Sequence, residues 1–191
     1  MASLNMTTLS RSYRVLPERP VTWVALVGFM GAGKSRIGWE LSRRLCLNFV
    51  DTDKVIEKVS SLKIPEIFDL YGESTFRDYE TEVLRRCVRL DEAVVSTGGG
   101  SVIRQENREL LKNRGPVVLL TASAETTYLR TRKSRRPLLE VSNPVERIRE
   151  LLAARQEYYK DAANFSVSTD GRRSWDVVEE IVYKLRYWQD G

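Results

Sequence analysis

Residues 28–35 read GFMGAGKS, a full match to the phosphate-binding pattern G-x-x-x-x-G-K-[ST]. The apolar, β-branched run at 21–27 before the motif is typical of a buried parallel strand. After the motif, Ile37, Leu41 and Leu45 recur at helical spacing and share one face. A strand, a glycine-rich loop and a helix in this order place a positive helix N-terminus beside a bound phosphate. The sequence therefore predicts a site for a triphosphate at this loop.

Each fixed position of the motif has a physical role in holding a triphosphate. Gly28 and Gly33 allow the backbone to wrap tightly, so that successive N–H groups point at the β-phosphate. Lys34 can reach the β- and γ-phosphates, and the Ser35 hydroxyl can join the shell of a Mg²⁺ ion. We expect six consecutive residues to contact the nucleotide: Gly31, Ala32, Gly33, Lys34, Ser35 and Arg36.

The composition excludes several classes of site. The chain has 191 residues, no histidine and two cysteines, Cys46 and Cys87, which lack metal-ligand spacing. This excludes a zinc centre and the histidine-dependent hydrolases, so any general base must be a carboxylate, lysine or tyrosine. The net charge of +5 favours small anionic ligands, because the arginines are spread along the chain without an aromatic-rich nucleic-acid signature. No apolar run approaches the roughly 20 residues that cross a bilayer.

The first twenty residues differ from the rest of the chain. Residues 1–20 are polar, rich in Ser, Thr and Arg, and lack the apolar core of a secretory signal. We expect a disordered tail; the alternative is a short remnant of an organelle-targeting segment, which would indicate a plastid. Otherwise we expect a cytoplasmic protein, since reduced cysteines are typical of intracellular proteins. Residues 21–191 are expected to form a single domain.

Strand-like and helix-like segments alternate through that domain. Strands are expected at 21–27, 47–50, 93–96, 116–120 and 165–168. Helices are expected directly after the phosphate-binding motif and at 53–60, 64–71, 75–89, 105–113, 125–132, 145–161 and 175–188, with a turn at 72–74 and an irregular basic segment at 133–144. The alternation predicts a three-layer α/β/α fold with a central parallel sheet of about five strands. Ligands of such sheets bind at the carboxyl ends of the strands.

Two further motifs follow predicted strands. The sequence FVDTD places the carboxylates of Asp51 and Asp53 two residues apart on one side of an extended segment. One could hold Mg²⁺ through water while the other accepts a proton from a hydroxyl; a helix N-cap at Asp53 is the structural alternative. The triple glycine at 98–100 follows the strand at 93–96, and it would bring backbone N–H groups close to a polar ligand. A plain flexible turn is the alternative there.

Taken together, these motifs resemble those of the shikimate kinases. In that family GFMGAGKS, FVDTD, a Phe-Arg pair (here Phe76-Arg77), a triple glycine and an Arg-Pro-Leu-Leu segment (here 136–139) occur in this order. The resemblance spans roughly residues 24–170. It implies a small-molecule kinase with the nucleoside-monophosphate-kinase-like fold, a substrate-binding segment at about 52–90 and a mobile lid at about 130–144.

On the acceptor side, the resemblance implies a role for each matched residue. Asp53 resembles the carboxylate that binds the shikimate hydroxyls, and it is the candidate base. Arg77 and Arg155 resemble the two arginines that clamp the shikimate carboxylate, a task that suits the paired donors of a guanidinium. Glu80, one helical turn after Arg77, is expected to steady it. The remaining acceptor contacts implied are the loop glycines and an apolar wall: Gly98, Gly99, Gly100, Phe68 and Phe76.

On the nucleotide side, the resemblance implies that Lys34 contacts the transferred phosphate. Ser35 and, through water, Asp51 would hold Mg²⁺. In the lid, Arg136 matches the arginine that reaches the phosphates on closure, and Arg130 resembles the arginine that packs on adenine. Closure would bring an arginine to the developing phosphoryl charge and exclude water from the site.

Two features depart from the family pattern. Arg36 stands where a small Ser or Thr is usual, and the lid between Arg130 and Arg136 is one residue short. Neither removes a catalytic group. The predicted catalytic residues are Lys34, Asp53 and Arg136.

The expected reaction is ATP-dependent phosphorylation of the shikimate 3-hydroxyl to shikimate 3-phosphate and ADP, a step of aromatic amino-acid biosynthesis. The expected partners are ATP or ADP and shikimate, without nucleic acid or membrane, and the expected state is a monomer. The alternatives are a silent regulatory or binding module of the same family, and a kinase for gluconate, another small polyol or a nucleoside monophosphate. The paired arginines and the triple glycine disfavour the other kinases, and the intact set of charged residues disfavours a silent module.

Overall fold

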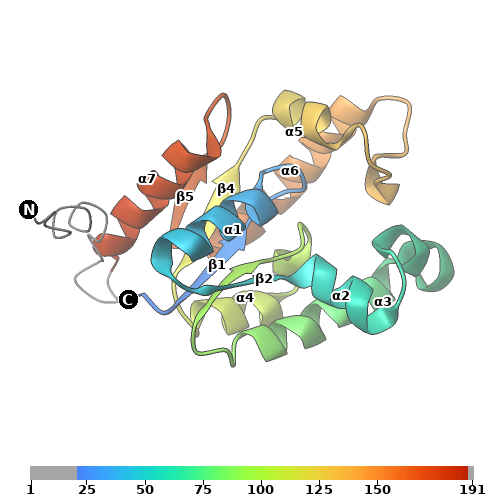
Figure 1. The fold of residues 1–191 in the computed structure, drawn as a ribbon. Coiled ribbons are helices and arrows are strands. Elements are labelled where there is room, and N and C mark those ends of the chain that lie inside the picture. The colour runs from blue at the N-terminus through green and yellow to red at the C-terminus, as the bar shows by residue number, and fades with distance from the viewer. Residues whose placement is uncertain (1–20, 189–191) are drawn as a thin grey trace, which may run out of the picture.

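The computed structural model describes residues 21–188, which fold around one parallel β-sheet (Figure 1). Five strands lie in the order β2-β3-β1-β4-β5, and every neighbouring pair is parallel. Their bounds are β1 Trp23–Val27, β2 Asn48–Asp51, β3 Ala93–Ser96, β4 Val117–Thr121 and β5 Phe165–Ser168. The predicted parallel sheet of about five strands is confirmed.

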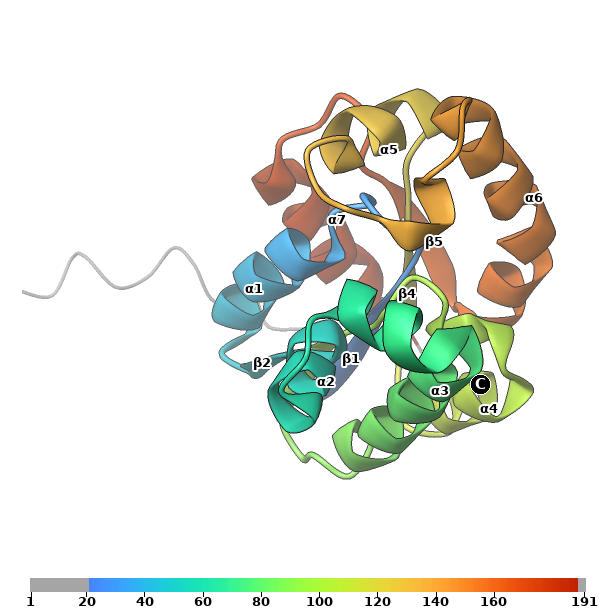
Figure 2. The same cartoon turned by 90° about the vertical axis from the view of Figure 1, so that its right-hand side faces the viewer.

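Helices cover both faces of this sheet (Figures 1 and 2). Their bounds are α1 Lys34–Leu45, α2 Thr52–Ser60, α3 Ile64–Cys87, α4 Gln105–Lys112, α5 Ala124–Thr131, α6 Pro144–Ala162 and α7 Ser174–Arg186, with short 3₁₀ turns η1 Ser101–Ile103 and η2 Pro137–Leu139. Helices α1 and α7 pack against each other on one face, while α3, α4 and α6 lie together on the other. The predicted three-layer arrangement is confirmed.

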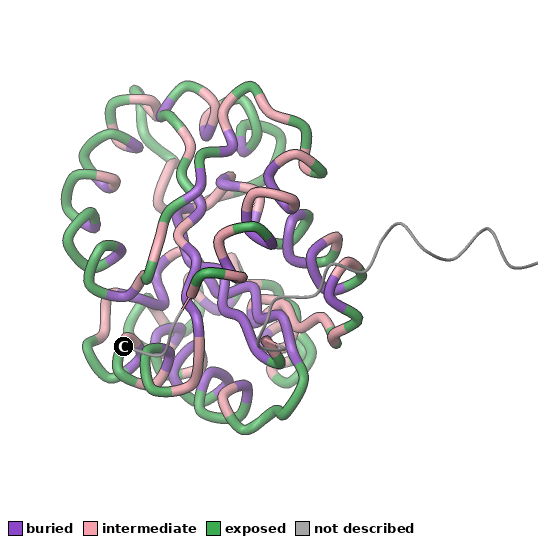
Figure 3. The backbone as a smooth tube through the Cα atoms, turned by 90° about the vertical axis from the view of Figure 1, so that its left-hand side faces the viewer, coloured by how far each residue is buried: buried purple, intermediate pink, exposed green. Residues whose placement is uncertain are grey.

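The core consists of two apolar clusters, one on each face of the sheet. Strand β1 is buried along its whole length, and it contributes alternate residues to the two clusters because successive side chains of a strand point to opposite faces. The central strands accordingly form the buried middle of the molecule (Figure 3). The last helix, α7, packs through one apolar face, because four residues at helical spacing are buried: Val178, Ile181, Val182 and Leu185.

The long helix α3 joins the two helices that were predicted at 64–71 and 75–89. Gly72 interrupts it with a φ of 77° and a ψ of 173°, so the backbone is not helical at that residue. A Cβ added at Gly72 would have no atom within 4 Å, so only the positive φ favours glycine here. Helix α3 is therefore two helical pieces that meet at Gly72.

Three strands bring the predicted motifs to one edge of the sheet. Strand β1 leads into the phosphate loop (residues 28–35), β2 ends at Asp51, and β3 leads into the triple glycine. The backbone N–H of Thr97, which follows β3, donates to the carbonyl of Leu26 in β1 at 3.1 Å. This bond extends the pairing of the two strands, so the phosphate loop and the glycine loop start side by side.

The expectation of a disordered tail at 1–20 lies outside the described residues. Between residues 21 and 188, none of the helices combines the length and the apolar character that crossing a bilayer requires. The basic segment 133–144 is irregular as predicted, apart from the single turn η2 and Pro144, which begins α6.

Candidate active site

A cavity of about 370 Å³ lies at the carboxyl edge of the sheet. In Figure 2 the lid segment (orange) and helix α3 (green) lie on opposite sides of this edge. The residues that line the cavity are Met30, Gly31, Gly33, Lys34, Ser35, Arg36, Asp51, Asp53, Ile64, Phe68, Phe76, Arg77, Ser96, Thr97, Gly99, Gly100, Arg130, Arg136, Pro137, Leu138 and Arg155. Of the predicted site residues, only Ala32 and Gly98 are not among them, and both are buried behind the lining.

Six lining residues were not predicted as site residues: Met30, Ile64, Ser96, Thr97, Pro137 and Leu138. Position next to a motif could have found four of them, because Ser96-Thr97 precedes the triple glycine and Pro137-Leu138 follows the lid arginine. Ile64 lies one helical turn before Phe68, so the helical spacing could have found it as well. Met30 occupies a variable position of the phosphate loop and carries no such signal.

The phosphate loop adopts a conformation that requires its glycines. Gly28, Gly31 and Gly33 have φ angles of 142°, 75° and 93°, which L-residues with a side chain rarely adopt. A Cβ at Gly28 would collide with the carbonyl oxygen of Leu120 in the neighbouring strand β4. Gly33 is the N-cap of α1 and supplies no side-chain cap, so the first N–H groups of this helix are free to bind an anion.

Lys34, the first residue of α1, points back into this loop. Its side chain is buried, and Nζ donates to the carbonyls of Gly28 at 2.7 Å and Phe29 at 2.9 Å. Burial lowers the pKa of Lys34 to about 8, although the carboxylates of Asp53 and Asp51 oppose the change. A lysine held in this way presents a positive charge to the cavity from a fixed position.

Two carboxylates at the end of β2 have different roles in the structure. Asp51 caps α2, because its Oδ1 accepts the N–H groups of Asp53 at 3.1 Å and Lys54 at 3.3 Å. The alternative that Asp53 is the helix N-cap is therefore wrong. Within the described residues, the buried Oδ1 of Asp53 has no hydrogen-bond partner. Burial, with the nearby charges of Asp51 and Glu80, raises the pKa of Asp53 to about 6.

A buried carboxylate therefore faces the cavity with an unsatisfied acceptor and a pKa near neutrality. Leaving such a group without a partner is costly, and proteins retain buried acceptors of this kind where a ligand completes them. A hydroxyl placed against Asp53 would supply the missing donor. The same carboxylate could then accept the proton of that hydroxyl.

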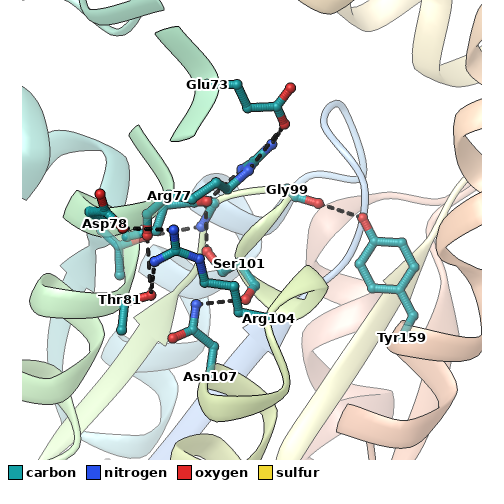
Figure 4. Close-up of polar contacts among 12 residues, drawn as sticks. Glu73, Arg77, Asp78, Thr81, Gly99, Ser101, Arg104, Asn107 and Tyr159 are labelled. Carbon is teal, nitrogen blue, oxygen red and sulfur yellow. Dashed lines mark hydrogen bonds and ion pairs between the residues drawn. The ribbon is translucent and has the colours of Figure 1, made fainter. Parts of the chain in front are cut away.

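Arg77 is fixed in a network of charged groups beside the glycine loop (Figure 4). Its side chain is only 9% exposed and pairs with Glu80 and with Glu73. The fully buried Glu80 also accepts the hydroxyl of Ser101 at 2.8 Å, so the network joins α3 to the turn after the glycines. The prediction that Glu80 steadies Arg77 is confirmed by this contact.

The triple glycine is required because of this network. A Cβ at Gly98 would collide with the carboxylate of Glu80, and one at Gly100 would collide with the guanidinium of Arg77. At Gly99 the contact would be the backbone nitrogen of Met30, at 3.0 Å. The glycines thus allow the loop to lie directly on the charged groups and on the phosphate loop.

Helix α6 contributes a second arginine to the cavity. The side chain of Arg155 is buried, and its guanidinium carbon lies 5.6 Å from the centre of the Phe29 ring. One turn later, Tyr159 donates its hydroxyl to the carbonyl of Gly99 at 2.6 Å (Figure 4). Burial raises the pKa of this tyrosine to about 12, so it remains a donor. No sequence pattern indicated Tyr159 as a support of the glycine loop.

An apolar wall closes the acceptor side. The rings of Phe68 and Phe76 lie 4.9 Å apart at an interplanar angle of 42°. Phe68 comes from the first piece of α3 and Phe76 from the second, so the wall spans the break at Gly72. Leu138 of the lid lines the same cavity.

The three arginines predicted for the nucleotide side have different surroundings. Arg130 donates to the carbonyl of Gly31 at 3.0 Å and to Thr169, so it connects the phosphate loop to the end of β5. Arg136 is half-buried at the cavity, where its Nε donates to the Ser134 hydroxyl at 3.2 Å. Arg36 is exposed and pairs with Glu40 on α1 at 2.7 Å.

The described residues include no group of three or more His, Cys, Asp or Glu side chains that could hold a metal ion. Ser35 and Asp51 both line the cavity and offer two oxygen donors. This limited set fits Mg²⁺, which prefers oxygen ligands and normally keeps water and phosphate oxygens in its shell. It does not fit a metal that needs a complete protein cage.

The comparison with known proteins agrees with this geometry. The family model described as shikimate kinase matches residues 30–186. The chain belongs to the shikimate kinase family. Within the family, it is 55% identical to the shikimate kinase of Deinococcus radiodurans over 92% of this chain and 89% of that protein. It is 52% identical to a shikimate kinase of Thermus thermophilus over 90% of this chain and 94% of that protein.

A solved structure shares the fold of this shikimate kinase family member. The shikimate kinase of Acinetobacter baumannii in complex with shikimate has a TM-score of 0.83 at 37% identity. The superposition covers 91% of this chain and 94% of that one. The family match at 30–186 includes every residue that lines the cavity.

Proposed function

We propose that this enzyme transfers the γ-phosphoryl group of ATP to the 3-hydroxyl of shikimate, which yields shikimate 3-phosphate and ADP. One observation carries the proposal: a single cavity joins the phosphate loop to the unpartnered carboxylate of Asp53 and to two buried arginines, Arg77 and Arg155. The phosphate loop suits a nucleotide, Asp53 suits a hydroxyl, and the two arginines suit a carboxylate. Shikimate carries a hydroxyl and a carboxylate on one ring.

On the acceptor side, Arg77 and Arg155 bind the shikimate carboxylate. Their buried position increases the strength of such a pair, since a charge-assisted contact weakens in water. Phe68 and Phe76 contact the ring, and the backbone of Gly99 and Gly100 supplies polar contacts from the opposite direction. Gly98 contributes indirectly, because its lack of a side chain leaves room for the carboxylates of Glu80 and Asp53.

On the nucleotide side, the free N–H groups at the start of α1 and the ammonium of Lys34 bind the β- and γ-phosphates. The backbone of 31–33 follows the phosphates, and Arg130 and Arg36 lie beside the nucleoside. Ser35 and Asp51, the latter through water, would hold Mg²⁺, which supplies charge neutralisation for the phosphate oxygens when bound.

Catalysis depends chiefly on positioning and charge neutralisation. Asp53 orients the acceptor hydroxyl in line with the γ-phosphate and takes its proton late in a loose transfer. Lys34 and Arg136 stabilise the charge that develops on the transferred group. The lid over 130–144 excludes water, which would otherwise accept the phosphoryl group.

The remaining aspects of the proposal follow the family. The enzyme acts in aromatic amino-acid biosynthesis in the cytoplasm, as a monomer of one kinase domain at 21–191, without nucleic-acid or membrane partners. A silent regulatory module is disfavoured, since the cavity retains the full set of charged groups that the reaction needs. Gluconate also carries a carboxylate that two arginines could bind, so a gluconate kinase is disfavoured by the match of residues 30–186 to the shikimate kinase family.

The direct test is ADP release measured with and without shikimate. We expect release that depends on both shikimate and Mg²⁺, with shikimate 3-phosphate identified by mass spectrometry. Gluconate and a nucleoside monophosphate serve as control acceptors and should give no release above background. Release that is independent of shikimate, or no release at all, would contradict the proposal.

A further inference from the structure

Arg135, the lid residue directly before Arg136, contacts the opposite side of the cavity. Its guanidinium pairs with both carboxylate oxygens of Asp69, through Nη1 at 2.7 Å and Nη2 at 3.3 Å. Its Nε donates to Glu140 in the same lid at 2.8 Å. Asp69 lies in the first piece of α3, one residue after Phe68. A bidentate ion pair therefore joins the lid to the substrate-binding helix α3.

This contact is exposed, unlike the buried pair of Arg77 and Glu80. The side chains of Arg135 and Asp69 are each 52% exposed, so water and salt weaken their attraction. Hydrogen bonding from Arg135 lowers the pKa of Asp69, which keeps the carboxylate ionised in the neutral range. An ion pair of this kind can bias a movable segment towards one position without locking it there.

The two elements that it joins are suited to relative movement. The first piece of α3 is separated from the rest by Gly72, whose non-helical backbone interrupts the helix. The second piece, in contrast, holds the buried pair of Arg77 and Glu80. A shift of the first piece with the lid would thus leave the carboxylate-binding network undisturbed.

Arg136 depends on the same segment for its position. In the described part of the chain it makes no ion pair, and its one hydrogen bond goes to Ser134 of the lid itself. Arg135 is thus the nearest residue along the chain that anchors the lid to another element. The position of Arg136 therefore depends on how the backbone of the lid is held.

We propose that Arg135 is a positioning residue, whose ion pair with Asp69 closes the lid onto the substrate-binding helix and so places Arg136 at the phosphates. This inference rests on the proposed function for its kinetic consequence, but the contact itself does not depend on the identity of the acceptor. Asp69, a residue of the acceptor side, would thus help to place Arg136 on the nucleotide side.

The first experiment measures lid opening by limited trypsin digestion of the Asp69→Asn variant. This substitution leaves the basic lid sequence intact, so fragments cut at 130–136 report the open population. Loss of an exposed ion pair should increase the cutting rate by about twofold to fivefold. Raising NaCl from about 0.05 M to about 0.5 M should remove most of the difference from wild type.

Asp78→Asn is the matched control. Asp78 lies on the same helix and forms an exposed pair with Arg104 at 2.6 Å, which does not involve the lid. Its loss should leave cutting in the lid unchanged. Equal cutting rates in the two variants, measured at low salt, would overturn the inference.

The second experiment separates positioning from binding. Asp69→Asn and Arg135→Gln should each lower kcat by about twofold to fivefold and leave the KM for shikimate unchanged. The double variant should be no slower than Arg135→Gln alone, because both single variants remove the same contact between the lid and α3. An increase in the KM alone, or additive losses in the double variant, would overturn it. Failure of the proposed function would be distinct, since wild type would then lack shikimate-dependent ADP release.

Discussion

The acceptor side and the lid both depend on arginines, but they hold them in opposite ways. Arg77 has a side chain that is 9% exposed and belongs to a buried network with Glu80 and Ser101. Arg135 has a side chain that is 52% exposed, and its partners are carboxylates on the surface. The difference matches what each region must do, because a binding site for a rigid ring needs fixed groups, whereas a lid must open.

The energetic consequence of burial is asymmetric. A buried charge that loses its partner retains the full cost of desolvation, whereas an exposed charge is rehydrated. The geometry of the acceptor side therefore depends on every partner in the buried network of Arg77 being present. Movement of the lid depends on contacts that are individually weak.

The largest expected effect comes from the one carboxylate in the described cavity that has a buried oxygen without a partner. Asp53→Asn should lower kcat by about 10²- to 10⁴-fold, because an amide cannot accept the proton of the acceptor hydroxyl. Steady-state ADP release measures the loss, and binding of a fluorescent ATP analogue should survive. Turnover within about tenfold of wild type would remove the role of Asp53 as base.

Removing one arginine from each region tests whether the two regions differ in stability. Arg77→Ala leaves Glu80 buried and uncompensated, so the free energy of unfolding should fall by about 3–5 kcal/mol. Arg135→Ala removes only exposed contacts, and its midpoint in urea should stay close to that of wild type. Urea denaturation followed by circular dichroism provides both values. Similar losses in the two variants would show that the regions do not differ in this way.

The burial of Asp53 should make the stability of the protein depend on pH. Its pKa is raised from 3.8 to about 6 in the folded protein, so folding favours the protonated form. The cost of the ionised form is absent below about pH 4, develops as the pH rises to about 6, and corresponds to about 3 kcal/mol above that. Asp53→Asn should therefore be more stable than wild type at about pH 7.5, with no such advantage at about pH 4. If Asp53→Asn exceeded wild type in stability by the same amount at both pH values, the buried ionised carboxylate of Asp53 would not be the cause.

A smaller effect is expected at the support of the glycine loop. Tyr159→Phe removes one hydrogen bond to Gly99, which should cost about 1 kcal/mol of stability and lower kcat/KM for shikimate about threefold to tenfold. Tyr158→Phe is the matched control, since within the described residues the Tyr158 hydroxyl forms no hydrogen bond. Indistinguishable kinetics of the two variants would exclude a positioning role for Tyr159.

Local patterns in the sequence predicted the framework of this site. The phosphate loop and the triple glycine follow apolar strands, and FVDTD spans the end of β2. Parallel strands bring their carboxyl ends to one edge of the sheet, so these motifs lie together. The five strands and the core face of α7 follow from the same periodicities. The family resemblance then named Arg77 and Arg155.

Contacts between distant residues were not predictable in this way. Tyr159 and Gly99 are 60 positions apart, and Arg135 and Asp69 are 66 apart, so no periodicity links them. The choice of Asp51 over Asp53 as helix cap depends on where α2 begins, to within one residue. That boundary is set by packing, and sequence patterns place helix ends only to within a few residues.

The close packing of Gly98 and Gly100 on charged side chains has a practical consequence for anyone who wants to alter the choice of acceptor. Substitutions in that loop would displace Glu80 or Arg77 and so damage the site before they could reshape it. The piece of α3 before Gly72 contributes the side chains of Ile64 and Phe68 to the cavity. Laboratory evolution towards new ring substrates should therefore accumulate its productive changes around Ile64 and Phe68, and should leave the glycines untouched.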